Sequence, residues 1–437
     1  MKNKTKLWLI FGPIICAALL LIGIFSLPWE RTFSKGSLYQ AAASQTKTVF
    51  KGKDMRQKAY KLGYVPFYGS SELSRFDNMH PTVLATKYRR GYMPFLLGAA
   101  GSQSLAQYQG MQDAPSKKAV MVISPQWFTQ EGQDPAAFSL YYSPLHVTDF
   151  ILNAQDTEAD RYAARRFLKM DCVKSNHVLS HALFEIAAGL ELPKTERYYL
   201  LWRRRMYSNE DRFFTSFQLR DRLPKIEQQG KSLPDKYSYK GLLKVSNQEA
   251  KRNTRGNPFG IRTGFYRKRL NPKLLKRLKG SQKKFNYVQS PEFSDLELVL
   301  NQFSKDKTQV LFVIPPVNAK WRKYTGLSQK MYEKSVNKIK HELISQGFDN
   351  IYDLSQMGGK KHFMEDTIHL GWNGWLYMDQ AVKAFMKQKY VKPTYALNDY
   401  FFTEDWRNTK TVPKVALTNK QVLANLKNRL IEIFSCL

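Results

Sequence analysis

The sequence predicts an α/β protein with a parallel sheet, a helical insertion and one N-terminal transmembrane helix. Three observations lead to this fold class. Short, continuous apolar runs have the composition of strands that are buried on both faces, as in parallel sheets. Amphipathic helical patterns alternate with these runs, which is the order of elements in α/β folds. One long segment rich in Ala, Leu, Arg and aromatic residues breaks the alternation.

The chain begins with a predicted membrane anchor. Three lysines in residues 1–6 precede an apolar run that we place at residues 7–28, and about 20 apolar residues cross a hydrocarbon core of roughly 30 Å. A cleaved signal peptide has a shorter apolar stretch followed directly by a small-residue site, whereas this run ends in Leu27-Pro28-Trp29. We therefore expect an uncleaved anchor, with a signal peptide as the alternative.

The anchor sets the expected topology. Residues 1–6 form a cytoplasmic tail, because so short a segment is readily left inside, and the large domain then lies outside the cell. The polar and mixed residues 29–62 predict a stalk with helical character. Residues 63–392 are expected to form the main extracellular domain, and residues 393–437 a C-terminal extension without an assigned role.

The net charge limits the expected partners. The 437 residues include 69 Lys and Arg against 36 Asp and Glu, which gives a net charge of +33 at pH 7. Such a charge attracts polyanions, namely nucleic acid, an anionic membrane surface or an anionic wall polymer. Because a domain outside the cell meets little nucleic acid, we expect anionic lipid headgroups or teichoic-type polymers as partners, and no nucleic acid.

The predicted sheet has five strands. The apolar runs that define it are Tyr64–Gly69, Tyr92–Gly98, Ala119–Ser124, Gln309–Pro315 and Asn350–Leu354. Between them, helices are expected to begin at the capping residues Ser290 and Ser328, and the last helix of the domain is expected at Asn373–Met386.

The helical insertion is predicted at about residues 156–256. Up to about Arg222 its composition indicates several helices and no strand. The polar, Lys-rich stretch that follows, to about Gly256, is interpreted as a mobile loop.

The first candidate for chemistry is a serine. The first predicted strand ends in Gly69-Ser70-Ser71, which places Ser71 at the carboxyl edge of the sheet, where α/β proteins put their sites. Taken alone, a Gly-Ser-Ser sequence is more often a turn or a helix cap.

The second candidate is an Asp-x-x-His sequence, Asp366 to His369, between the fifth strand and the last helix. A serine nucleophile needs a base that takes its proton, and the base needs a carboxylate that orients it. An Asp three residues before a His can reach the imidazole Nδ1 and leave Nε2 free to face the serine. Alone, the pair is also compatible with a His packed against Trp372 and a capping Asp.

Together, the two candidates are more specific. A serine after the first strand and an Asp-x-x-His before the last helix is the layout of SGNH hydrolases, which have a three-layer α/β fold. We therefore predict a catalytic triad of Ser71, Asp366 and His369. An oxyanion site is also required. Gly101 follows the second strand and can present a backbone N–H, and Gln126 follows the third strand, where SGNH enzymes usually have an Asn.

Cofactors and metals are not expected. His177 and His181 share a helix face, but no Glu completes a zinc-protease motif, and we expect core or surface roles for them. P-loop and dinucleotide fingerprints are absent from the sequence. Cys16, Cys172 and Cys436 show neither a pairing pattern nor a metal-ligand spacing, so no structural disulfide is expected.

Six sequence motifs resemble the DltD family of Gram-positive bacteria, whose operon adds D-alanine to teichoic acids. The motifs are Tyr68–Leu73, Phe95–Gly98, Ile123–Phe128, Asn257–Arg262, Ser290–Phe293 and Asp366–Trp372, and they span almost the whole chain. The nucleophile of the family is the second serine of its Gly-Ser-Ser-Glu motif, which corresponds to Ser71. The catalytic Asp and His of the family correspond to Asp366 and His369.

The resemblance implies a function in lipoteichoic and wall teichoic acid D-alanylation. D-Alanine is loaded on a D-alanyl carrier protein in the cytoplasm, and a membrane-bound O-acyltransferase of the same operon passes it across the bilayer. The DltD protein then helps to place it as an ester on the polymer. The expected partners are therefore the acyltransferase, the carrier protein at least indirectly, and lipoteichoic acid as acceptor.

Two other classes of function remain open. An esterase that removes D-alanyl or acetyl groups would share the triad and differ only in using water as the acceptor. A non-catalytic partner that docks the acyltransferase through its transmembrane helix would explain the anchor but not the triad. The arginine groups Arg89-Arg90 and Arg203–Arg205 are candidates for binding the phosphates of an acceptor polymer, although charge runs are more often a solvated face.

Overall fold

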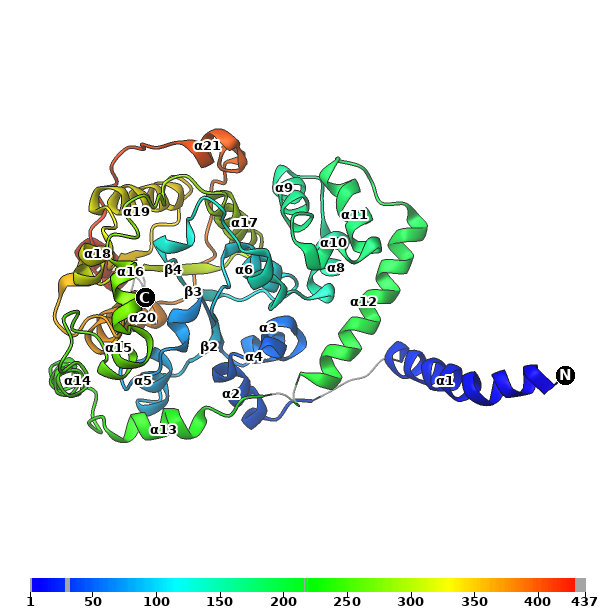
Figure 1. Cartoon of the computed structure of the whole chain (residues 1–437), viewed down its shortest axis with the longest axis horizontal. Coiled ribbons are helices and arrows are strands. Elements are labelled where there is room, and N and C mark those ends of the chain that lie inside the picture. Colours follow the sequence, from blue (N-terminus) through cyan, green and yellow to red (C-terminus); the bar gives the residue numbers. More distant parts are fainter. Residues whose placement is uncertain (1, 28–31, 216, 218, 429–437) are drawn as a thin grey trace, which may run out of the picture.

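The central element of the protein is a five-stranded parallel sheet (Figure 1). The computed structural model describes residues 2–27, 32–215, 217 and 219–428. The strands are β1 (Tyr64–Tyr68), β2 (Met93–Leu97), β3 (Lys118–Val122), β4 (Gln309–Ile314) and β5 (Ile351–Asp353). They lie in the order β2-β1-β3-β4-β5 and all pair in parallel. The predicted α/β class and all five strand positions are confirmed.

The sheet separates two hydrophobic cores, which makes three layers. Side chains alternate between the two faces of a strand, and Phe312 of β4 packs in one core whereas Val313 packs in the other. Every residue of β4 is buried. Burial on both faces explains why the strands are continuous apolar runs in the sequence.

Helices cover both faces of the sheet. One core, which we call the main core, includes residues of α6 (Ser104–Met111), α8 (Pro144–Asn153), α17 (Glu292–Lys305) and α19 (Gln329–Ile344). The other core includes residues of α5 (Pro81–Lys87), α14 (Tyr239–Asn253), α20 (Trp372–Lys387) and α22 (Asn419–Asn428). The helices predicted after Ser290, after Ser328 and at the end of the domain are α17, α19 and α20.

The N-terminal helix α1 (Lys2–Ser26) projects away from the rest of the protein (Figure 1). Its segment Trp8–Ser26 is long and apolar enough to cross a membrane, and only 6% of that window is buried inside the protein. These properties fit a single-pass anchor.

The helical character predicted for residues 29–62 is present in the part that the structure describes, but this part packs against the domain. Residues 35–61 form α2 (Lys35–Ser44), α3 (Lys47–Lys51) and α4 (Asp54–Lys61). Ala41, Phe50 and Met55 are buried in the main core. The apolar side chains of this segment are buried in the two cores of the domain, so the segment packs on the domain instead of standing apart from it.

The helical insertion contains α9 (Glu158–Phe167), α10 (Asp171–Lys174), α11 (His177–Ala187) and α12 (Lys194–Phe214), as the composition predicted. The Lys-rich stretch after it is not a loop, because it forms α13 (Leu223–Lys231) and α14. Leu242, Ser246 and Ala250 of α14 recur at helical spacing and are buried. The lysines occupy the remaining faces of the helix, which made the segment look unstructured in the sequence.

The C-terminal extension packs on the domain. Phe401, Phe402 and Trp406 are buried in the main core, and the indole N–H of Trp406 donates to Glu342 Oε2 at 3.0 Å. The shorter helical elements of the protein are η1 (Ser71–Ser74), η2 (Pro125–Trp127), α7 (Pro135–Ser139), α15 (Thr263–Arg269), α16 (Pro272–Leu278), α18 (Ala319–Thr325), η3 (Ser355–Gly359), η4 (Asp399–Phe402) and α21 (Glu404–Asn408).

Candidate active site

Ser71 lies directly beyond the carboxyl end of β1. The strand ends at Tyr68, and the 3₁₀ turn η1 begins at Ser71. A Cβ atom on Gly98, at the end of the neighbouring strand β2, would lie 2.8 Å from the carbonyl oxygen of Ser70. Only glycine permits so close an approach. The glycine after β2 therefore lets the two strand ends meet beside Ser71.

Asp366 and His369 lie in a tight loop before α20. Met364 and Leu370 form an antiparallel bridge across the base of this loop. Asp366 Oδ1 accepts hydrogen bonds from the backbone N–H groups of Ile368 and His369, both at 3.0 Å. An Asp side chain that bonds to the backbone two and three residues on holds such a turn in place, so the carboxylate is fixed before it meets the imidazole.

The three predicted triad residues converge. Ser71 Oγ is 2.7 Å from His369 Nε2, although 298 positions separate the two residues in the chain. His369 Nδ1 lies 2.8 Å and 2.9 Å from the two carboxylate oxygens of Asp366. The carboxylate accepts only when Nδ1 carries the proton, which leaves Nε2 as the acceptor for the Ser71 hydroxyl. The arrangement is that of a nucleophile, a base and an orienting carboxylate.

The carboxylate of the triad is held in its charged form. Asp366 is buried, and burial alone would raise its pKa, but the hydrogen bond and charge of His369, the N–H of Ile368 and the charge of Arg75 together lower the pKa below its usual range. Arg75 Nη2 lies 3.5 Å from Asp366 Oδ2. An ionised Asp366 can stabilise the imidazolium that forms when His369 accepts a proton.

The two predicted oxyanion residues follow the ends of β2 and β3, as expected from the sequence. Gly101 has a φ of +85°, and its carbonyl accepts from Gln133 Nε2 at 3.1 Å. Its loop is fastened to the nucleophile turn, because Ser70 Oγ donates to the Ala99 carbonyl at 3.1 Å. Gln126 Oε1 is buried without a hydrogen-bond partner among the described residues. No hydrogen bond between described residues joins Gly101 or Gln126 to Ser71 or His369, so their oxyanion role stays a prediction.

Several buried acids beside the triad were not predicted from the sequence. Burial raises the pKa of Glu72, the residue after Ser71. Burial and the charge of Glu365 raise the pKa of Asp77 to about 7. Asp77 accepts from the backbone N–H groups of Met79 at 2.7 Å and Trp372 at 2.6 Å, so it joins the turn after Ser71 to the start of α20. The position of Glu72 within the Gly-Ser-Ser-Glu motif was a signal that could have been used.

Four basic residues, which we call the basic rim, lie beside the triad: Arg75, Arg222, Lys225 and Arg262. Arg262 Nε is 2.9 Å from Glu365 Oε1, and its guanidinium lies 5.1 Å from the ring centre of Trp372. Arg222 and Lys225 both lie over the ring of Phe76, at 5.2 Å and 5.9 Å. Burial and the charge of Arg222 lower the pKa of Lys225, with smaller contributions from Arg262 and Arg220. The rim therefore concentrates positive charge from three distant segments.

The arginines that the sequence suggested for phosphate binding are largely used within the fold. Arg90 forms a buried ion pair with Asp379. Arg204 forms ion pairs with Asp113 and Asp149, and Arg203 donates to Tyr199 and Tyr207. These side chains have carboxylate or phenol partners already, which the spacing of charges in the sequence did not reveal.

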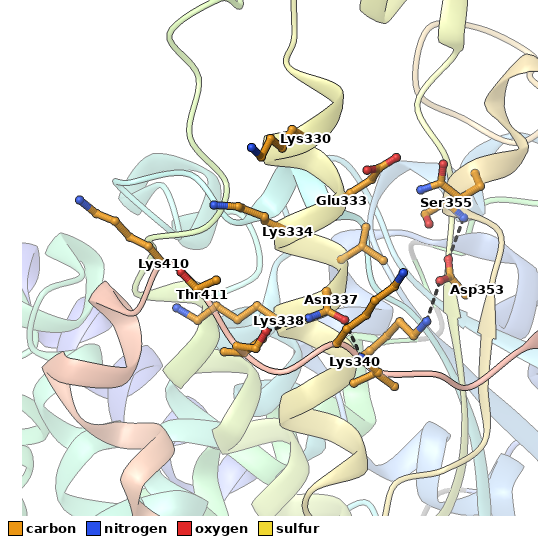
Figure 2. Close-up of a pocket in the computed structure, with 15 residues that line it drawn as sticks. Lys330, Glu333, Lys334, Asn337, Lys338, Lys340, Asp353, Ser355, Lys410 and Thr411 are labelled. Atoms are coloured by element: carbon orange, nitrogen blue, oxygen red, sulfur yellow. Dashed lines mark hydrogen bonds and ion pairs between the residues drawn. The ribbon is translucent and has the colours of Figure 1, made fainter.

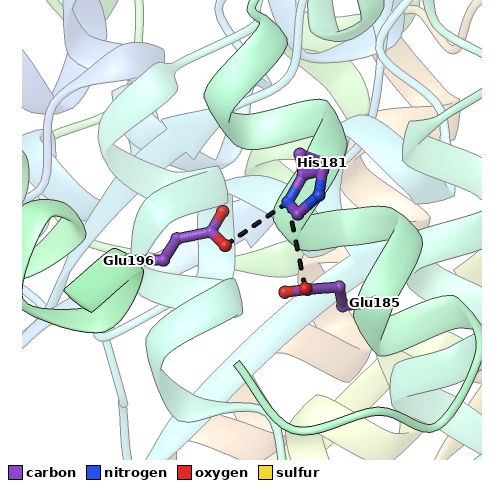
Figure 3. A group of neighbouring side chains, drawn as sticks. All are labelled: His181, Glu185 and Glu196. Carbon is purple, nitrogen blue, oxygen red and sulfur yellow. Dashed lines mark ion pairs between the residues drawn. The ribbon is translucent and has the colours of Figure 1, made fainter. Parts of the chain in front are cut away.

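Two other groups of polar residues lie apart from the triad. A cavity of about 540 Å³ between α19 and the C-terminal segment is lined by lysines such as Lys330, Lys334 and Lys410 (Figure 2), and no triad residue lines it. On the insertion, His181 Nδ1 lies 3.3 Å from Glu196 Oε2 and 3.9 Å from Glu185 Oε1 (Figure 3). Of the core or surface roles that were expected for His181, the exposed side chain fits the surface role.

The cysteines agree with the prediction as far as they are described. Cys16 and Cys172 are both free. Cys436 lies outside the described residues.

Comparison with known proteins gives a consistent answer. The family model described as DltD protein matches residues 42–387. The chain is 44% identical over 408 residues to the Protein DltD of Lacticaseibacillus rhamnosus, covering 92% of this chain and 96% of that protein. It is 33% identical over 392 residues to the Protein DltD of Bacillus subtilis (strain 168), covering 86% and 97%. For the Protein DltD of Staphylococcus aureus the identity is 28% over 393 residues, covering 86% and 96%.

Proposed function

Because this chain belongs to the DltD family, we propose that it transfers D-alanine as an ester onto lipoteichoic or wall teichoic acid outside the cell membrane. The observation that carries the proposal is the contact of 2.7 Å between Ser71 Oγ and His369 Nε2, with Asp366 behind the imidazole. This geometry supports acyl transfer through a covalent serine ester.

The reaction has two halves. His369 Nε2 takes the proton of Ser71 as Oγ attacks the carbonyl carbon of a D-alanyl ester or thioester. The C–O bond forms, and the oxyanion then expels the alkoxide or thiolate of the donor, which receives the proton from His369. In the second half, His369 takes a proton from a hydroxyl of the polymer, which attacks the D-alanyl ester of Ser71. Ser71 leaves with that proton, and the enzyme is regenerated.

The oxyanion would be held beside the nucleophile turn. Ser71 begins η1, and the first N–H groups of a helical turn have no partner within it. We place the Ser71 and Gly101 N–H groups and the Gln126 amide around the oxyanion. An oxyanion needs a donor, and the Gln126 side chain can supply one through its amide NH2 group. The amide oxygen has no hydrogen-bond partner among the described residues, so no partner of that oxygen fixes the amide in place.

The acceptor is proposed to bind the basic rim. A transferase must hold its acceptor hydroxyl near the acyl-enzyme, and guanidinium groups bind phosphates through two parallel hydrogen bonds. The side chains of Arg75 and Arg262 are 35% and 32% exposed, so part of each guanidinium remains accessible to a phosphate although each also forms an ion pair, with Asp366 and Glu365 respectively. A polyol-phosphate chain supplies the required anions.

The location and partners follow from α1. With α1 as a single-pass anchor and the C-terminal domain outside, the triad is positioned to receive D-alanine that has crossed the bilayer. The donor would be delivered by the membrane-bound O-acyltransferase of the same operon, supplied in turn by the D-alanyl carrier protein. Lipoteichoic acid in the same membrane is the acceptor.

The test compares two neighbouring serines. Ser71→Ala and Ser70→Ala are each expressed at native level in cells that lack the wild-type protein, and ester-linked D-alanine on lipoteichoic acid is measured. We expect Ser71→Ala to match the deletion strain. Ser70→Ala makes the same change at the neighbouring residue and removes the hydrogen bond from Ser70 Oγ to the Ala99 carbonyl, which supports the turn. Lipoteichoic acid in these cells should retain most of its D-alanine. Membrane insertion and protein abundance are measured in the same cells.

Other results would select the other functions. Wild-type D-alanine in Ser71→Ala cells would mean that the protein acts by assembling the acyltransferase complex. D-Alanine above the wild-type level would mean that the protein removes the ester and is an esterase.

A further inference from the structure

Most of the large apolar side chains that are exposed outside α1 gather on the helical insertion. They belong to α11, to α12 and to the residues directly after each helix. The residues are Phe184, Leu190, Tyr198, Tyr199, Leu201, Trp202, Phe213, Phe214 and Phe217. Single exposed apolar residues are normal on a protein surface, whereas a gathered set indicates an interaction site.

One stripe of α12 passes from a covered end to an uncovered end. Tyr198, Trp202, Asn209 and Phe213 are spaced by four, seven and four positions, so they lie on the same face of the helix. At the C-terminal end, Phe213 meets the ring of Phe25 in α1 at 6.3 Å. At the N-terminal end, Tyr198 and Trp202 are 73% and 41% exposed. This face of α12 is therefore in contact with α1 at its C-terminal end and exposed at its N-terminal end.

Asn209 fixes this face at the outer end of the anchor. Its Nδ2 donates to the carbonyls of Phe25 and Leu27, both at 2.6 Å. Phe25 lies in the last turn of α1 and Leu27 follows the helix, and the carbonyls at a helix end have no donors within the helix. α12 lies on the side of the protein from which α1 projects (Figure 1). If α1 spans a bilayer, Asn209 therefore sits at the level of the outer membrane surface.

The helices α11 and α12 present their exposed residues together. His181 of α11 contacts Glu196 near the start of α12 (Figure 3), and this ion pair joins the two helices. Phe184 lies one turn beyond His181 on α11 and is exposed. Tyr198, Leu201 and Trp202 lie on one side of α12 at helical spacing, and together with the exposed Phe184 of the adjoining helix we call them the interfacial patch.

The composition of the patch matches the boundary between lipid and water. Trp and Tyr favour the headgroup level of a membrane because their rings are apolar at one end and polar at the other. Arg205, one turn beyond Trp202, is also exposed, and a cation at this position is attracted to anionic headgroups.

We infer that the interfacial patch inserts into the headgroup region of the outer leaflet and holds the catalytic domain at a fixed height and tilt over the membrane. This inference rests on the proposed role of α1 as an anchor and is independent of the chemistry at Ser71. With two attachments, α1 and the patch, the domain cannot swing freely about the end of α1. The triad then stays within reach of a polymer that is rooted in the same membrane.

The test uses the full-length chain in vesicles. The native cysteines are replaced (Cys16→Ser, Cys172→Ala, Cys436→Ser), and single cysteines at Tyr198, Trp202, Ile15 or Phe285 carry an environment-sensitive fluorophore. The protein is reconstituted into phosphatidylglycerol and phosphatidylethanolamine vesicles that contain nitroxide lipids with shallow or deep quenching groups. Phe285 is the matched control, because it is an aromatic residue of similar exposure, 46%, that lies outside the insertion.

We expect labels at positions 198 and 202 to be quenched several-fold more by the shallow than by the deep nitroxide, and the label at Phe285 by neither. The label at Ile15 reports the anchor and should respond to the deep nitroxide. Quenching at position 15 without quenching at 198 and 202 would overturn the inference and leave the anchor intact. Absence of quenching at all four positions would overturn the anchor as well.

A protein partner is the competing occupant of the patch. In native membranes that contain the acyltransferase, labels at 198 and 202 that are shielded from both nitroxide lipids and aqueous quenchers would show that a protein covers the patch. That result would overturn the inference, whereas lipid quenching in these membranes would support it.

Discussion

The carboxyl edge of the sheet and the outer face of α12 are both rich in polar and aromatic side chains. At the sheet edge the key side chains bond to one another, whereas on the outer face of α12 Tyr198 and Trp202 are exposed. At the sheet edge, Ser71, His369 and Asp366 satisfy one another at 2.7 to 2.9 Å. On α12, Tyr198 and Trp202 face outward. The difference indicates that the sheet edge is organised by internal contacts, whereas the α12 face needs an environment outside the chain.

A second contrast lies within the active-site region, where two buried carboxyls have pKa values shifted in opposite directions. Asp366 and Asp77 are both buried acids, but the partners of Asp366 lower its pKa whereas burial and the charge of Glu365 raise the pKa of Asp77 to about 7. Asp366 faces an imidazole, and Asp77 receives only backbone N–H groups next to a like charge. The partners of these two buried carboxyls, and not their burial alone, decide whether the pKa is lowered or raised.

The largest effect is expected from a change at Asp366, the orienting carboxylate of the sheet-edge network. Asp366→Asn should lower the rate of D-alanyl transfer by about 10⁴-fold, because an amide that faces Nδ1 favours the wrong imidazole tautomer. The measurement is the release of D-alanine from a D-alanyl thioester by the purified full-length protein in detergent. Glu365→Gln changes the neighbouring carboxyl in the same way and should stay within about tenfold of the wild-type rate. Equal losses in both variants would argue for a general electrostatic effect instead of a triad.

A smaller effect is expected when the basic rim is altered but the triad is kept. Arg262→Met should reduce transfer to a polyol-phosphate acceptor by about tenfold, as expected for one lost charge-assisted contact, and leave hydrolysis of the same donor unchanged. The D-alanylated acceptor and free D-alanine are measured in one assay at low and at high salt. Because added salt screens the charge of Arg262, the difference in transfer rate between Arg262→Met and wild type should be smaller at high salt. Arg269→Met removes the same charge from an exposed position on α15 and should match wild type. An equal loss of transfer and hydrolysis in Arg262→Met would remove the rim from acceptor binding.

A pH experiment sharpens the contrast between the two buried acids. The folded pKa of Asp77, about 7, lies above the unfolded value of about 3.9. The folded state therefore binds the proton more tightly, and the contribution of Asp77 to stability is fully present below about pH 4 and is lost as the pH rises toward 7. The wild-type free energy of unfolding should fall across this window, by up to about 1.4 kcal/mol per pH unit from this group.

Asp77→Asn is the variant for this experiment, because an amide resembles the protonated carboxyl but cannot ionise. Its free energy of unfolding in denaturant titrations should be less dependent on pH between 4 and 7 than that of wild type. Parallel curves for the two proteins would mean that Asp77 is ionised without penalty in the folded state.

The smallest effect is expected at the junction between the two regions. Asn209→Ala removes two hydrogen bonds to α1, each worth about 0.5–1.5 kcal/mol. The fold and the activity should persist, but α1 should move more freely relative to α12. The distance distribution between spin labels at Gly23 and Arg205 should broaden, and Ser208→Ala, the neighbouring change, should leave it narrow. An unchanged distribution in Asn209→Ala would assign the junction to the Phe25, Phe213 and Phe214 rings alone.

The sequence by itself determined the five strands, the helices α17, α19 and α20, and the three residues Ser71, Asp366 and His369 that lie together at the sheet edge. Strands buried on both faces must be apolar throughout, and a triad at the edge of a parallel sheet needs its residues directly after strands or before helices. These are local requirements, so they leave local patterns.

Only the tertiary structure decided how the remaining polar and aromatic residues are used. Residues 35–61 look polar in sequence but bury Ala41, Phe50 and Met55 in the core. Arg90 and Arg204 look like free charges but have Asp partners from distant segments, whereas Lys225 of the basic rim comes from the Lys-rich stretch that was interpreted as a mobile loop. Whether a charge is paired, or an aromatic ring is covered, depends on residues far away in the chain. Those contacts form only when the sheet, the insertion and the anchor are assembled.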